Sequence, residues 1–148
     1  MDPATAFAAL SLACNVAQLV EQGITVTRFC RTLYEKGSLD ENDLIETYAK
    51  EITAANKEIE VALKEQPPAP RTTRLQSTAQ DVLATADKLR IELNKLKFSK
   101  TQGKSIASVG RAFRSALRNL SNSGKIKDIQ TTLEKQEKAL QSGLLNDL

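Results

Sequence analysis

Histidine and tryptophan are absent from this chain of 148 residues, and aromatic residues make up only 4% of it. Without histidine, no imidazole can act as a general base, a proton shuttle or a zinc ligand. β-branched residues form few runs outside residues 24–27, which disfavours strands. Enzymes that depend on imidazole are therefore excluded, and folds built on a sheet are disfavoured.

The two cysteines are too far apart along the chain to form a disulfide within one helix. Cys14 and Cys30 lie 16 positions apart, about 24 Å along a continuous helix. We expect both to be small buried hydrophobic residues in a reducing compartment. No basic segment precedes the apolar N-terminus, so no secretory signal peptide is expected. We predict a cytoplasmic protein that becomes associated with a membrane on activation.

The motifs typical of catalytic or cofactor sites are also missing. Gly103, Lys104 and Ser105 resemble the end of a phosphate-binding loop, but Phe98 stands where that loop needs glycine. The carboxylates between residues 42 and 65 fall on the polar face of a helix, where water solvates them. We therefore predict no enzymatic activity and no cofactor, metal or small-molecule substrate.

Helix-forming residues dominate the composition of the chain, and 41% of its residues are hydrophobic. Apolar residues recur at helical spacing in segments from Pro3 to Gly37, from Ser38 or Asp40 to Pro67, from Thr72 or Thr73 to about Ser99, from Ile106 to Leu120, and from Lys125 to the end. The sequence predicts an all-α, up-and-down helical bundle of four to five helices, with residues 1–148 as a single domain. We expect the domain to be the N-terminal part of a longer receptor.

Several local features are predicted within these segments. Gly23 and the β-branched residues after it favour a kink or short break in the first helix. A polar loop is expected over residues 99–103. The core faces of the second and third helices are expected to comprise Leu44, Tyr48, Ile52, Ala55, Ile59 and Leu63, and Leu75, Ala79, Val82, Ala86, Leu89, Leu93 and Leu96.

The first helix carries no charged residue from Pro3 to Val20, a length of about 27 Å. A thin polar stripe of Ser11, Asn15, Gln18 and Gln22 runs along it. Two interpretations stay open: a central helix that the bundle buries on most sides, or a helix that is buried at rest and enters a membrane when several copies align. The candidate residues of a membrane-active helix are Phe7, Leu10, Leu12, Val16, Leu19 and Val20.

Charge is distributed unevenly along the chain. Residues 35–65 contain nine acids and four bases, whereas residues 88–127 contain eleven bases and one acid, Glu92. On the helix over 106–120, Lys104, Arg111, Arg114 and Arg118 fall within about 80° opposite the apolar stripe. This arc is either a solvated face of the bundle or a patch for anionic lipid or an acidic partner. Nucleic acid is the weaker alternative, because no recognition motif or stacking aromatic residues accompany the charges.

Several segments together resemble a known family. They are the opening Met1, Asp2 and Pro3, the uncharged segment with residues 15–20, the run Arg31 to Tyr34, and the later segments 83–97, 104–120 and 125–148. In this order they resemble the N-terminal, HeLo-like helical domains of fungal NLR-like (STAND) receptors, which precede a nucleotide-binding NACHT module. Some relatives kill cells by attacking membranes with their N-terminal helix.

The resemblance implies the signalling or effector end of such a receptor, acting in programmed cell death or innate immunity. We expect a homo-oligomer, or a bundle that binds partner helices, and an anionic membrane as target. The alternative hypothesis is a helical protein–protein adaptor or regulatory bundle without membrane activity. Leakage of anionic vesicles would discriminate the two.

Overall fold

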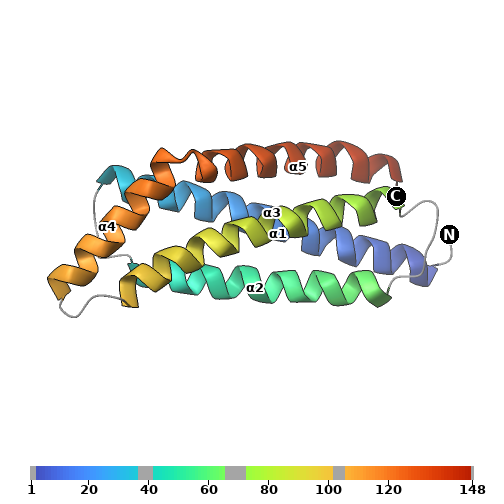
Figure 1. The fold of residues 1–148 in the computed structure, drawn as a ribbon. Helices are drawn as coiled ribbons and strands as arrows, with labels where there is room; N and C mark the ends of the chain where they lie inside the picture. The colour runs from blue at the N-terminus through green and yellow to red at the C-terminus, as the bar shows by residue number, and fades with distance from the viewer. Residues whose placement is uncertain (1–2, 37–41, 66–72, 102–105, 148) are drawn as a thin grey trace.

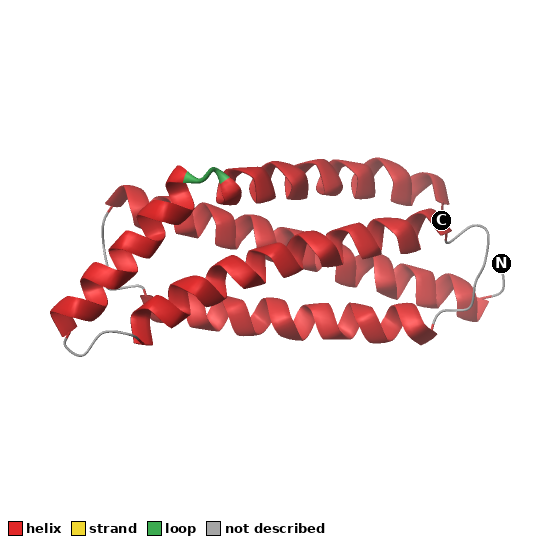
Figure 2. Cartoon of the chain, in the orientation of Figure 1, coloured by secondary structure: helices red, strands yellow, loops and turns green. Residues whose placement is uncertain are grey.

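The structure, a computed structural model, describes residues 3–36, 42–65, 73–101 and 106–147. Five helices occupy these ranges: α1 (Pro3–Lys36), α2 (Asn42–Glu65), α3 (Thr73–Thr101), α4 (Ile106–Asn122) and α5 (Lys125–Asp147). The described ranges contain no strand (Figure 2). The predicted all-α helical bundle is confirmed.

Four long helices form the body of the bundle, and the shorter α4 slants across one end of it. α1, α2, α3 and α5 lie along the long axis and alternate in direction (Figure 1). α1 and α3 each contact all four of the other helices. These two helices therefore form the centre of the molecule.

The predicted apolar stripe of α3 is confirmed in full. All seven of its residues are buried: Leu75, Ala79, Val82, Ala86, Leu89, Leu93 and Leu96. Their spacing of three and four positions places them on one face of the helix. That face meets the other four helices and supplies a large share of the core.

α1 buries a broader face than α3, because neighbours pack against it from several sides. Its buried hydrophobic residues are Ala9, Leu12, Ala13, Val16, Leu19, Val20, Ile24, Val26, Cys30 and Leu33. They span about half of the helix circumference at 100° per residue. Thr27 is also buried there, and its hydroxyl donates to the carbonyl of Ile24 at 2.8 Å. A charge on this buried face would lie in the core without a partner, which explains why the face has none.

Of the kink or short break expected near Gly23, the break is wrong. α1 stays helical through Gly23 and the β-branched residues after it. Gly23 faces α5 so closely that a Cβ atom there would lie 2.7 Å from Cδ1 of Leu133. The glycine therefore serves close packing of two helices, and tertiary contacts override its low helix propensity.

Three smaller expectations also need correction. Leu44 is 41% exposed and its neighbour Ile45 is buried in its place, whereas the other five predicted core residues of α2 are buried or partly buried against the core: Tyr48, Ile52, Ala55, Ile59 and Leu63. Helix α3 continues to Thr101 instead of ending near Ser99. Cys14 is exposed, although Cys30 is buried as expected. The predicted helix ends at Gly37, Ser38, Asp40, Pro67 and Thr72 lie outside the described residues.

A tight turn joins α4 to α5 (Figure 2). Gly124 adopts a positive φ of 73°, which favours glycine, and the hydroxyl of Ser123 donates to the carbonyl of Leu120 at 2.8 Å. The backbone amide of Asp128 donates to the carbonyl of Gly124 at 2.9 Å. This turn confirms the predicted stop after Asn122 and sets α4 at an angle to α5.

Candidate functional site

The six candidate residues for membrane insertion fall into two groups in the structure. Leu12, Val16, Leu19 and Val20 are at most 1% exposed and belong to the core. Phe7 and Leu10 are 74% and 49% exposed in the first turns of the same helix. The core face of the uncharged segment is therefore unavailable while the bundle is closed, and its exposed large apolar side chains lie in the N-terminal turns.

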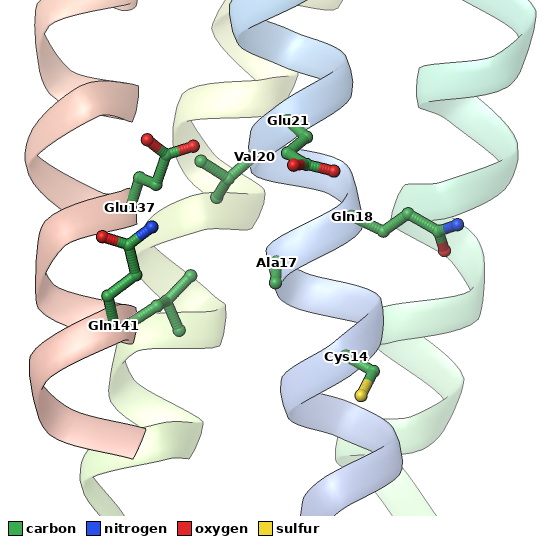
Figure 3. Close-up of a pocket in the computed structure, with 8 residues that line it drawn as sticks. Cys14, Ala17, Gln18, Val20, Glu21, Glu137 and Gln141 are labelled. Carbon is green, nitrogen blue, oxygen red and sulfur yellow. The ribbon is translucent and has the colours of Figure 1, made fainter. Parts of the chain in front are cut away.

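Beyond Leu10, a groove lies between α1 and α5 (Figure 3). Its volume is about 430 Å³, and its lining includes Cys14, Ala17, Val20 and Leu140. Gln18, Glu21, Glu137 and Gln141 supply the polar part of the lining. Sequence reasoning missed this groove, because it depends on how α5 packs beside the small residues of α1.

The polar stripe of α1 lies beside this groove and toward α2, and Gln18 borders both. Gln18, Gln22 and Thr25 line a second groove, of about 310 Å³, together with Tyr48 of α2. The Oε1 atom of Gln22 is buried there without a hydrogen-bond partner among the described residues. The stripe is thus only partly covered by the bundle.

The basic arc lies on α4. Arg111, Arg114 and Arg118 are all exposed, whereas Leu117 and Leu120 on the opposite face are buried. Lys104 lies outside the described residues, as do the side chains of Ile106, Val109 and Phe113. For the three arginines, the predicted division of the helix into a basic and an apolar face therefore agrees with the structure.

Glu92 joins the helices beneath this basic arc. It is 8% exposed, and its Oε1 atom lies 3.2 Å from Nζ of Lys95 and 3.6 Å from Nζ of Lys125. The second of these ion pairs connects α3 to the start of α5. The sequence marks Glu92 as the one acid in a basic segment, but only the structure shows that it anchors this junction.

The two candidate surfaces lie at opposite ends of the bundle. The N-terminal turns of α1 are at the end away from α4, which crosses the other end (Figure 1). In the closed bundle, Phe7 and Leu10 are thus well separated from Arg111, Arg114 and Arg118. A single end-on contact with a flat membrane would not engage both surfaces.

Cysteines and carboxylates are among the described side chains that could bind a metal ion or act as nucleophiles. No group of three or more cysteines and carboxylates is placed to hold a metal ion there. Burial raises the pKa of the Cys30 thiol to about 12, so this cysteine is a poor nucleophile.

One segment of the described helices, Phe7–Leu33, is long and apolar enough to cross a membrane by length and composition. The central helix of a soluble bundle meets the same criterion. Comparisons with protein-family models, with curated proteins and with solved structures find no match to this chain. The fold defines the protein as an all-α helical bundle.

Proposed function

We propose that this bundle is an N-terminal signalling or effector domain that self-associates and acts on anionic membranes, as its resemblance to fungal NLR-like receptor domains implies. In this proposal, the arginines of α4 hold the closed bundle on the lipid surface. Opening of the bundle then releases α1, which inserts. Death or immune signalling of the host cell is the expected consequence.

The observation that carries the proposal is the nature of α1. Its first 18 residues contain no charge, and the first turns of the helix already present Phe7 and Leu10 to the surroundings. Exposure of large apolar side chains is unfavourable in water and favourable at the boundary between lipid headgroups and acyl chains. An uncharged helix of this length also matches the thickness of the hydrocarbon layer.

The exposed arginines of α4 support the first step. Each basic residue close to an anionic membrane contributes about 1 kcal/mol, and this contribution falls as salt screens the charges. Arg111, Arg114 and Arg118 share one face of a helix that packs at the periphery of the bundle. Their binding to lipid therefore needs no change in the fold.

The adaptor hypothesis is favoured by a different observation, the complete burial of Leu12, Val16, Leu19 and Val20. These side chains stabilise the bundle like any core residues. A protein that never opens would keep them buried and use its surface alone. The two hypotheses therefore differ in whether α1 leaves the bundle.

Charge reversal on α4 tests the proposed membrane contact. Replacement of Arg111, Arg114 and Arg118 by Glu should abolish sedimentation with anionic vesicles and the leakage of a trapped dye. The matched control reverses three exposed lysines elsewhere, Lys57, Lys64 and Lys138, and should retain most of the binding. Equal loss of vesicle binding in both variants would indicate a response to net charge alone. If the parent protein neither binds the vesicles nor releases the dye, the adaptor hypothesis is favoured.

A further inference from the structure

An uncharged strip with large apolar side chains runs along the exposed side of α1. Phe7 and Leu10 are 74% and 49% exposed, Cys14 is exposed, and Ala17 is partly buried. Their spacing of three, four and three positions places them within about 80° of the helix circumference. The strip has large side chains in its N-terminal half and small ones in its C-terminal half.

The C-terminal half of the strip, which has the small side chains, borders the groove between α1 and α5. Cys14 and Ala17 line one side of the groove, and Leu140 of α5 contributes to its lining (Figure 3). A groove of about 430 Å³ offers room for large apolar side chains that approach from outside. The bundle thus presents two projecting side chains and, farther along the same helix, a recess.

We propose that two copies of the chain pair through this strip, with their α1 helices antiparallel. Phe7 then lies opposite Ala17 of the second copy, and Leu10 lies opposite Cys14. The register is consistent, because Phe7 and Leu10 are three residues apart, as are Cys14 and Ala17. A two-fold axis through the strip, level with residue 12 along the helix, repeats both contacts, which is the self-complementary arrangement of a symmetric dimer.

Charge selects a second copy as the occupant of this strip. α1 is uncharged over the 18 residues from Pro3 to Val20, whereas the longest uncharged stretch elsewhere in the described helices is residues 139–146 of α5. Pairing of two uncharged strips removes the fewest charges from water, and the described surface offers such a strip on α1 itself. Only Glu21 and Glu137 are charged among the described residues that line the adjoining groove. In the same register Glu21 faces the start of the partner helix at Pro3, where the free amides favour a carboxylate.

The inference rests on the self-association in the proposed function and gives that association a defined interface. It adds that the soluble dimer covers Phe7 and Leu10, so that membrane and second copy compete for the same apolar strip. Dissociation of the pair would then precede any contact of α1 with lipid.

Disulfide trapping tests the register, because the native Cys14 supplies one half of the pair. Leu10→Cys should form a covalent dimer under mild oxidation, visible on a non-reducing gel, through residue 10 of one copy and Cys14 of the other. The parent should form little dimer, since its two Cys14 residues are offset along the helices by about 6 Å in this register. Leu10→Cys with Cys14→Ser should lose the dimer.

A matched control places a cysteine on another exposed apolar position. Val61 of α2 is 52% exposed, and Val61→Cys should give no covalent dimer. Equal cross-linking of Val61→Cys, or of Leu10→Cys with Cys14→Ser, would overturn the proposed interface. The absence of any dimer from Leu10→Cys would do the same.

Vesicle experiments separate this inference from the proposed function. If Leu10→Cys forms no dimer while Phe7→Ser lowers leakage from anionic vesicles, the strip faces lipid and the dimer is wrong, but the membrane function stands. If the dimer forms and neither parent nor variants release the dye, the interface stands and the membrane function fails.

Discussion

α1 and α4 are the two helices through which we propose contact with a membrane. α1 lies at the centre of the bundle, whereas α4 lies at its periphery. α1 contacts all four other helices and has a core face of ten hydrophobic residues. α4 lies across one end, buries Leu117 and Leu120, and exposes three arginines. The uncharged sequence of α1 reflects its central position at least as much as any affinity for lipid.

Because of this difference, membrane binding through α4 and membrane insertion of α1 require different amounts of free energy. Contact of α4 with anionic lipid uses side chains that are already exposed. Insertion of α1 requires that Leu12, Val16, Leu19 and Val20 leave the core, and the burial of each such side chain contributes about 1.5–3 kcal/mol. Binding should therefore be reversible and fast, whereas insertion should need a trigger that opens the bundle.

The largest expected effect is the loss of stability when the core face of α1 receives a charge. Val16→Asp places an unpaired carboxylate at a position that is 0% exposed, and it should lower the free energy of unfolding by at least about 3 kcal/mol. Ser11→Asp, at an exposed position of the same helix, should change it by less than about 0.5 kcal/mol. Urea denaturation followed by circular dichroism measures both. Similar stability of the two variants would show that the faces of α1 are assigned wrongly.

An intermediate effect is expected where α1 touches α5. Gly23→Val should destabilise the bundle by about 1–3 kcal/mol, because even its Cβ atom would lie 2.7 Å from Leu133. Leu133→Ala alone should also destabilise it, by about 2–5 kcal/mol. The double variant should be more stable than the sum of the two losses predicts, since the smaller residue makes room for valine. Strict additivity would contradict close packing at this point.

The smallest effect concerns the two cysteines of α1. A thiol reagent at pH 8 should modify the exposed Cys14 in the folded protein and reach the buried Cys30 only after unfolding, as mass spectrometry of the labelled chain can show. Burial raises the pKa of the Cys30 thiol to about 12, from an ordinary value of 9.0. Its contribution to stability is therefore complete below pH 9 and falls as the pH rises toward 12. Rapid labelling of both cysteines would contradict the packing of α1.

Sequence periodicity predicted α3 and the turn after α4 well, because each depends on local pattern. All seven apolar residues of the α3 stripe are buried, and Gly124 adopts the positive φ that its place after Asn122 suggests. Periodicity was less informative for α1, which is apolar over most of its surface. Three features depend on the position of α5: the groove beside Cys14, the fit of Gly23 to Leu133, and the ion pair between Glu92 and Lys125. Such pairings between distant segments leave no periodic signal in either segment alone.

The central claim is that α1 must leave the bundle for the membrane to be breached, and a reversible disulfide between α1 and α5 tests it most directly. In a Cys14→Ser background, Gly23→Cys and Leu133→Cys place two thiols on facing helices, where a Cβ atom at position 23 would lie 3.7 Å from Cγ of Leu133. Each single cysteine variant serves as a control. The oxidised protein should bind anionic vesicles through α4 without releasing the trapped dye, and reduction should restore release. Equal leakage before and after reduction would contradict the account, because α1 would then act on the membrane without leaving the bundle.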